Sequence, residues 1–209
     1  MKKNWKLWIF TSSIILLPIL AGLILWEQLP DKIPTHWDMT GEIDGWSSKP
    51  FAVFGLPLIL LAAQGIVLFT TSADPKRQNH TKKIIHATYW IIPLLSTVLC
   101  PIIYLAAMGK QVHIEIILPL LIGLILVIVG IYLPKCRQNY TIGIKLPWTL
   151  DSEENWNKTH RLSGWIWIGG GLIIMPLGFF GFLWLIFPIA LIMALVPTVY
   201  SYILHRKGI

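Results

Sequence analysis

The sequence predicts an all-α integral membrane protein with six transmembrane helices and both termini in the cytoplasm. Three observations support this prediction. Hydrophobic residues make up 55% of the 209 residues and charged residues 13%, against roughly 25% charged residues in soluble domains. Several uncharged runs are long enough to cross a hydrocarbon core of about 30 Å at 1.5 Å per residue. Lys and Arg are distributed unevenly among the loops between these runs.

The uncharged runs define the spans in order. The first four are residues 7–26, 51–71, 84–108 and 116–133. The first resembles a signal peptide because basic residues precede it, but it ends without a small-residue cleavage site, which predicts an uncleaved anchor. The last run, 164–202, is 39 residues long, about twice the length that one helix needs. We therefore expect two helices there, with a turn at residues 178–181 just after Pro176.

The basic residues predict the orientation, because cytoplasmic loops carry an excess of Lys and Arg. With the N-terminus inside, 14 of the 17 Lys and Arg residues lie on the cytoplasmic side, and Lys32, Lys49 and Lys110 lie outside. This distribution accounts for the net charge of +7. The partner predicted for the basic residues is therefore membrane lipid and not nucleic acid. Cys100 and Cys136 lack the spacing of a disulfide framework or a metal site.

Two long polar loops divide the chain into two predicted modules. Residues 1–71 form a two-helix module with an extracellular loop at 29–50, and residues 72–209 form a four-helix module with a cytoplasmic loop at 134–163. Residues 139–156 are the longest polar stretch of the chain. A stretch of this length is excluded from hydrocarbon, because its polar groups would lose water without gaining partners. It must lie at a membrane face.

The outer loop has the composition of a peptide-binding surface. Acidic side chains outside a cell attract a cationic peptide, and tryptophan offers apolar and cation–π contacts. The candidate peptide-binding residues are His36, Trp37, Asp38, Glu42, Asp44 and Trp46. The same residues lack the spacing of a zinc site, so no metal is predicted. The alternative is a solvated loop in which the acids and glycines form turns.

The cytoplasmic loop allows two interpretations. Asp151 and Glu154 have capping-box spacing, which predicts a short helix that begins there with Trp156 and His160 on one face. Neighbouring tryptophans suggest that this helix lies along the lipid headgroups before it turns into the fifth span. Membrane anchoring does not explain the motif at residues 143–147, so the other interpretation is a docking surface for a cytosolic protein. Its candidate residues are Asn139, Gly143, Lys145, Pro147, Trp148, Thr149 and Trp156.

The spans themselves contain few polar groups. Gln64, His86, His113 and Glu115 are the only candidates for a polar path. We find no nucleophile elbow, no phosphate-binding glycine loop and no pair of carboxylates at the midplane, so neither enzymatic activity nor a cofactor is predicted. A small-solute transporter or channel stays open as an alternative function, because six spans with proline kinks would suit one.

The two loops also carry recognisable motifs. Residues 29–37 with Gly41, Asp44, Gly45, Ser48 and Lys49 form the first, and Asn139, residues 143–150 and Trp156 form the second. They resemble, respectively, a DUF1648-type module and the cytoplasmic signature of the SdpI family of bacterial membrane immunity proteins. The family pattern has Arg and Thr where this chain has Lys145 and Leu146. Lysine keeps the charge of arginine without its planar fork.

The resemblance implies a multi-pass protein of the bacterial cytoplasmic membrane. It also implies protection against a secreted, membrane-active toxin peptide of the sporulation-delaying type. In our hypothesis the outer loop binds this peptide. The cytoplasmic loop then stabilises the helix bundle or signals toxin occupancy to a cytosolic partner.

Overall fold

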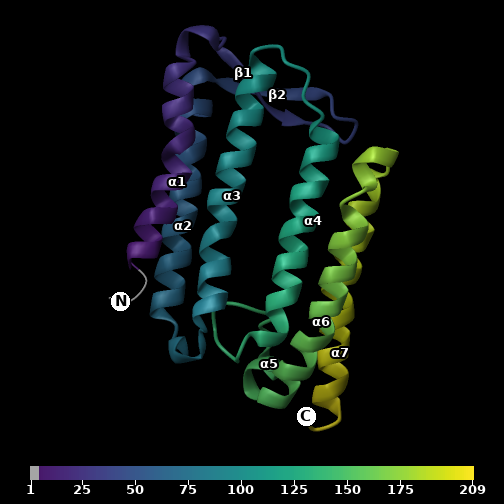
Figure 1. Cartoon of the computed structure of the whole chain (residues 1–209). Coiled ribbons are helices and arrows are strands. Elements are labelled where there is room, and N and C mark those ends of the chain that lie inside the picture. Colours follow the sequence, from purple (N-terminus) through teal and green to yellow (C-terminus); the bar gives the residue numbers. More distant parts are fainter. Residues whose placement is uncertain (1–4) are drawn as a thin grey trace. The chain divides into compact units, whose positions relative to one another are not determined.

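A computed structural model of the protein describes residues 5–209. Within this range six helical segments are long and apolar enough to cross a membrane, which confirms the predicted spans. Figure 1 shows the helices α1 (Trp5–Ile24), α2 (Leu56–Ala73), α3 (Lys82–Ala107), α4 (Ile114–Tyr132), α6 (Glu153–Ile174) and α7 (Ile186–Arg206), with a short helix α5 (Pro147–Asp151). A π-helical turn, Phe51–Gly55, extends the N-terminal end of α2. The cytoplasmic placement of both termini stays a prediction.

The outer loop departs from the all-α prediction, because it forms a β-hairpin. Strands β1 (Lys32–Trp37) and β2 (Ile43–Ser48) pair antiparallel as a two-stranded sheet. The local signal is the alternation of Ile33, Thr35 and Trp37, which places these three side chains on one face of a strand. Between the strands, the Asp38 carboxylate accepts hydrogen bonds from the backbone N–H groups of Thr40 and Glu42 and closes the turn.

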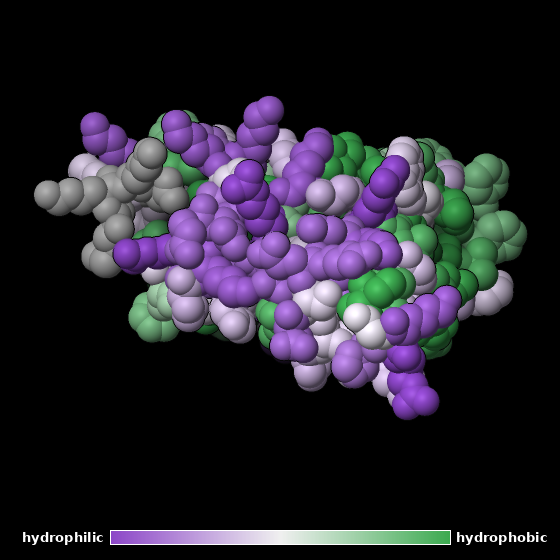
Figure 2. Space-filling view, turned by 90° about the horizontal axis from the view of Figure 1, so that it is seen from below, coloured by the Kyte–Doolittle hydropathy of each residue, from purple (hydrophilic) through white to green (hydrophobic). Residues whose placement is uncertain are grey.

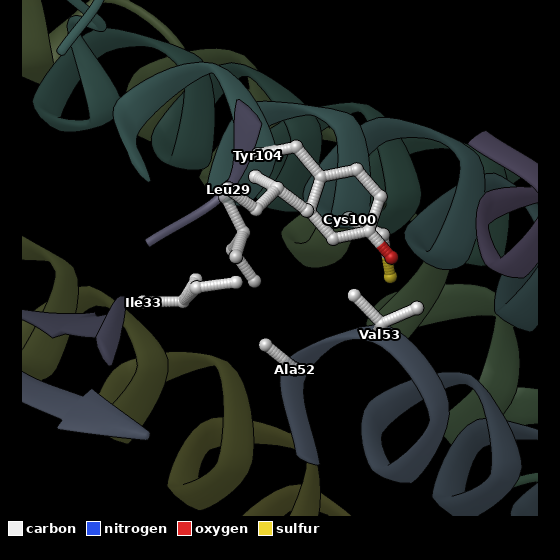
Figure 3. Close-up of a cluster of buried hydrophobic side chains, with 7 residues drawn as sticks. Leu29, Ile33, Ala52, Val53, Cys100 and Tyr104 are labelled. Carbon is white, nitrogen blue, oxygen red and sulfur yellow. The ribbon is translucent and has the colours of Figure 1, made fainter. Parts of the chain in front are cut away.

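The chain divides into two compact units. The first comprises the described residues up to residue 69, together with residues 88–114. Its hydrophobic core lies at the base of the hairpin (Figure 3) and contains Leu29, Ile33, Ala52, Val53, Cys100, Ile103 and Tyr104. The Tyr104 hydroxyl also donates a hydrogen bond to the Pro18 carbonyl at 3.2 Å. Residues from α1, α2 and α3 thus hold the hairpin base in place.

Gln64, a candidate for a polar path, has structural contacts within the first unit. Its side chain is fully buried. The side-chain amide donates hydrogen bonds to the Thr11 hydroxyl at 3.0 Å and to the Tyr89 carbonyl at 3.1 Å. These bonds connect α2 to α1 and α3, as polar side chains commonly do between transmembrane helices.

The second unit, residues 70–87 and 115–209, depends on close packing between α4 and α6. A Cβ atom added to Gly171 would lie 2.6 Å from the Gly123 carbonyl oxygen, and one added to Gly130 would lie 2.8 Å from the Gly164 carbonyl oxygen. Pairs of glycines seven residues apart on each helix therefore bring the two backbones into contact, as small residues do in membrane helix pairs.

Gly171→Ala is expected to destabilise the protein by about 1–3 kcal/mol, because the added methyl group meets the backbone of α4, which can move away only if the helix packing is distorted. Gly169→Ala on the same helix is the matched control, since a Cβ atom there meets nothing within 4 Å. Removing a helical glycine at that position should leave stability unchanged or raise it by up to about 1 kcal/mol. Thermal unfolding in detergent micelles measures both. Equal midpoints for the two variants would contradict the packing argument.

The predicted N-cap of the helix in the cytoplasmic loop, Asp151, is wrong by one residue. Asp151 is the last residue of α5, and Ser152 caps α6 by accepting a hydrogen bond from the Asn155 N–H at 3.2 Å. Aspartate and serine are both good N-caps, so the local sequence does not decide whether Asp151 or Ser152 caps the helix. The short α5 helix, which has Pro147 at its start, decides the outcome because it occupies Asp151.

The predicted helix along the lipid headgroups is also wrong. From Glu153 onward α6 runs as one helix into the fifth span. Trp156 and His160 do share a face, but both are buried inside the second unit. The predicted turn before the last span is confirmed: 3-10 turns at Leu177–Phe180 and Leu183–Leu185 flank Gly181, whose φ is 71°.

Candidate functional site

The six candidate residues of the outer loop divide between the faces of the hairpin. Trp37 lies on the same face as Ile33 and packs against the core of the first unit. His36, Asp44 and Trp46 lie on the opposite, exposed face, where Trp46 is 57% exposed. The two remaining candidates, Asp38 and Glu42, are exposed at the turn. The structure therefore brings five of the six to the accessible part of the hairpin and gives Trp37 a packing role.

His36 and Asp44 form a cross-strand pair on the exposed face. Nδ1 of His36 lies 2.5 Å from Oδ1 of Asp44. The strand register is irregular here, with His36 opposite Gly45. A Cβ atom on residue 45 would lie only 2.8 Å from the His36 Cβ, so glycine permits the close approach. Because the pair is exposed, it contributes at most about 1 kcal/mol to stability. Its main effect is to orient an acidic group beside Trp46.

The turn of the hairpin is acidic and partly apolar. Asp38 accepts hydrogen bonds from the Thr40 hydroxyl at 2.7 Å, the Thr40 N–H at 2.8 Å and the Glu42 N–H at 3.0 Å. These bonds, chiefly those from Thr40, lower the pKa of the Asp38 carboxyl group, which stays ionised. Met39 and Ile43 are exposed beside it. This surface suits an amphipathic peptide that carries positive charge.

A second candidate region lies at the other end of α2, within the second unit. The side chain of Asp74 is 0% exposed. It accepts hydrogen bonds from the Lys76 N–H at 2.7 Å, the Tyr140 N–H at 3.0 Å and the Thr141 hydroxyl at 2.6 Å. Nε2 of His80 lies 3.0 Å from Oδ2, the oxygen that also accepts from Tyr140 and Thr141. Burial acts to raise the pKa of this carboxyl group, but the hydrogen bonds outweigh it and the pKa is lowered.

Neighbouring residues extend this network along the cytoplasmic loop. The Gln138 side-chain amide donates to the carbonyls of Thr149 and Leu150, both at 2.9 Å, and its oxygen accepts from the Lys76 ammonium group. The Asn79 side chain donates to the Gln138 carbonyl at 2.6 Å. The loop that begins at residue 134 is thus fastened to the connection between α2 and α3. Figure 2 shows hydrophilic side chains gathered on the end that carries α5.

Asn139 shapes the turn that follows. Its side-chain oxygen accepts hydrogen bonds from the N–H groups of Thr141 at 2.8 Å and Ile142 at 2.7 Å. Its amide donates to the carbonyls of Arg137 and Ile142. This is the local backbone bonding for which asparagine is favoured in turns. Asn139 is fully buried, so its contacts are internal to the unit.

Trp156 and His160 form the centre against which the loop packs. The Trp156 indole donates to the Cys136 carbonyl at 2.7 Å, and its ring stacks on His160 with centroids 4.0 Å apart. Nδ1 of His160 lies 2.8 Å from the Trp156 carbonyl oxygen, and Nε2 accepts from the Ile144 N–H at 2.9 Å. These partners assign the tautomer with its hydrogen on Nδ1. Burial raises the pKa of the adjacent Cys136 thiol to about 11, so it stays protonated at neutral pH.

The rest of the signature connects α5 to α7 or is exposed. The Trp148 indole donates to the Ser201 hydroxyl at 2.8 Å, stacks on the His205 ring and meets the Tyr202 ring edge to face. Thr149 is buried, and its hydroxyl accepts from the Leu146 N–H at 2.9 Å. Lys145 and Pro147 are exposed. The Lys145 ammonium group donates to the Thr141 carbonyl at 2.9 Å, a single contact that does not require the planar fork of arginine.

Sequence reasoning missed Asp74, Asn79, His80 and Gln138. An aspartate before a proline at the end of an apolar run is a turn signal, so a turn at Asp74 was available from the sequence. Nothing local indicated its partners, because Thr141 lies 67 residues further along the chain. Among residues 5–209, no group of three or more His, Cys, Asp or Glu side chains is arranged to hold a metal ion.

The six membrane-length helices among residues 5–209, with polar regions at both ends of α2, define a multi-pass protein of the cell membrane. Residues 135–201 match the SdpI/YfhL protein family, and residues 13–61 match DUF1648, a domain of unknown function. The two matched ranges contain the two motifs found in the sequence, which confirms the resemblance that these motifs indicated. It is 29% identical over 210 residues to the immunity protein SdpI of Bacillus subtilis (strain 168), covering 99% of this chain and 98% of that protein. No solved structure matches it.

Proposed function

We propose that this protein is an immunity protein that protects the cell from a secreted, membrane-active toxin peptide of the sporulation-delaying type. The observation that carries the proposal is the similarity, over nearly the full length of both chains, to the immunity protein SdpI. Protection proceeds by binding at the outer face and involves no catalysis. The exposed face and turn of the hairpin form the binding surface.

The charge and rigidity of the hairpin support this role. Asp38, Glu42 and Asp44 attract a cationic peptide over a screening distance of about 8 Å at physiological ionic strength. Trp46 and Met39 then contact its apolar side chains. The hairpin base is held by the hydrophobic core and by Lys49, whose ammonium group donates to the Trp26 carbonyl at 3.2 Å. A preformed surface loses little entropy when the peptide binds.

The cytoplasmic region has a stabilising role in this proposal. Asn139, Thr149 and Trp156 are buried, and their hydrogen bonds stay within the second unit. They hold the loop against α6 and against the connection between α2 and α3. A cytosolic partner that senses toxin occupancy would contact the exposed residues Lys145 and Pro147.

The triple variant Asp38→Asn, Glu42→Gln, Asp44→Asn tests the binding surface. Asparagine at position 38 keeps an oxygen that can accept the turn hydrogen bonds, so the variant removes charge with little change of shape. Three lost charge interactions of up to about 1 kcal/mol each lower the toxin concentration for half-maximal killing about tenfold. The measurement is survival of toxin-sensitive cells that express each protein at equal level.

A matched control removes the same kinds of charge elsewhere. Asp31→Asn, Asp151→Asn, Glu153→Gln changes exposed acids that lie outside the exposed face and turn of the hairpin, and it should protect as well as the wild type. If the hairpin variant protects equally well, the acidic surface does not bind the toxin. If the wild-type protein, present in the membrane, gives no protection, the immunity proposal itself is wrong.

A further inference from the structure

The two outer edges of the hairpin differ. In an antiparallel pair, residues alternate between pairs that exchange backbone hydrogen bonds and pairs whose N–H groups point outward. The Lys49 N–H donates to the Asp31 carbonyl at 2.9 Å, directly beside the pair formed by Lys32 and Ser48. That bond makes Lys32 and Ser48 a pair with outward N–H groups. By alternation the next such pair is Pro34 and Trp46.

Strand β1 is protected against further pairing and β2 is not. Pro34 has no N–H to offer, and Lys32 places a charge on the edge; both are common protections of edge strands. On β2, Trp46 and Ser48 each carry an outward N–H group. In residues 5–209, neither takes part in a backbone hydrogen bond outside the helices and strands. The sheet has only two strands, so β2 has one open edge.

We propose that the open edge of β2 binds an extended segment of the toxin peptide as a third strand. This inference rests on the proposed immunity function and specifies how the partner is held. The backbone groups of Trp46 and Ser48 supply the main-chain hydrogen bonds, which give affinity in strand addition, while neighbouring side chains give specificity. A peptide at a membrane surface gains from such pairing, because its backbone groups otherwise go unsatisfied in apolar surroundings.

The side chains along β2 favour this occupant. Asp44 lies two residues from Trp46 on the same exposed face, and the turn adds Asp38 and Glu42. The bound segment therefore has a basic residue toward the turn and an apolar residue against the Trp46 ring.

Hydrogen exchange measures the edge directly. In the purified protein in detergent micelles, we expect fast exchange at the Trp46 and Ser48 amides and slow exchange at the Ser47 amide, which faces β1. Addition of the synthetic toxin peptide should slow exchange at Trp46 and Ser48 at least tenfold and leave Ser47 unchanged. Fast exchange at both edge amides with the peptide present, in a protein that does protect cells, would overturn the strand-addition inference and leave the immunity function standing. Slow exchange without peptide at high protein concentration would make the occupant a second copy of the chain.

A pair of substitutions separates the backbone from the side chain. Ser48→Pro removes the outward N–H group, and Ser48→Ala removes the same hydroxyl but keeps the N–H. We expect about tenfold weaker toxin binding for Ser48→Pro, from one lost hydrogen bond and an obstructed edge, and less than twofold for Ser48→Ala. Lys32→Pro makes the same backbone change on the other edge and should leave affinity within twofold. Slow exchange at Ser47 verifies that each variant keeps the hairpin. Equal weakening by Ser48→Ala and Ser48→Pro would refute the role of the edge.

Discussion

Asp74→Ala is expected to destabilise the protein by about 3 kcal/mol or more. The substitution leaves the part-buried N–H groups of Lys76 and Tyr140 without their acceptor, and it leaves the Thr141 hydroxyl with only the Thr70 carbonyl, at 3.2 Å. Each buried donor without a partner costs about 1–3 kcal/mol, with some recovery from water or relaxation. Asp74→Asn should destabilise the protein less than Asp74→Ala, because the amide keeps one oxygen that accepts hydrogen bonds. Some cost remains, because the amide NH2 group faces the Tyr140 N–H, and two donors cannot form a hydrogen bond.

Thermal unfolding in detergent micelles provides the comparison, with Asp151→Ala as the control. Asp151 is an exposed aspartate of the same unit, and its substitution should change stability by no more than about 0.5 kcal/mol. Similar midpoints for Asp74→Ala and Asp151→Ala would show that the network does not hold the loop.

The lowered pKa of Asp74 adds a pH dependence to this prediction. A carboxyl group whose pKa is lower in the folded state contributes stability above its unfolded pKa, which is about 3.9, and this contribution disappears as the pH falls through the folded value. The difference in the free energy of unfolding between the wild type and Asp74→Asn should therefore decrease below about pH 4. A constant difference between pH 7 and pH 3 would contradict an ionised Asp74.

The membrane explains why the spans were predictable. Every crossing segment must be helical and of a length set by the bilayer, so the runs that end near Trp26, Thr71 and Leu133 identify helices without knowledge of their contacts. The turn before α7 was predictable for a similar reason. One uncharged run had about twice the length that a single transmembrane helix needs, and it contained Gly181.

The contacts of the polar regions were not predictable in the same way. The sequence does not show whether Trp156 anchors at a membrane interface or packs in a core, because an indole has an apolar body and one polar group and suits both places. Only the Cys136 carbonyl, 20 residues away, shows that its partner is protein. The hairpin was missed because its turn residues, Asp38 and Gly41, are equally suited to an irregular loop. The assignment of toxin binding to this hairpin stays a prediction.

The motif at residues 143–147 has a structural explanation that leads to the other large expected effect. Gly143 has a φ of +124°, a backbone conformation in which a side chain is strained. A Cβ atom there would also lie 2.4 Å from Nε2 of His160, the atom that accepts the Ile144 N–H. Gly143→Ala therefore combines backbone strain with displacement of a buried hydrogen-bonded ring. We expect a loss of about 3 kcal/mol.

Gly109→Ala separates the two causes, because Gly109 also has a positive φ, +72°, but a Cβ atom there meets nothing within 4 Å. It should cost about 1 kcal/mol from backbone strain alone. A double-mutant cycle then tests the contact with the ring: Gly143→Ala combined with His160→Ala should cost less than the sum of the two single changes, since the ring that the new methyl group meets is gone. Additive losses would mean that Gly143 is required for its backbone conformation only, and that the loop does not depend on its packing against His160.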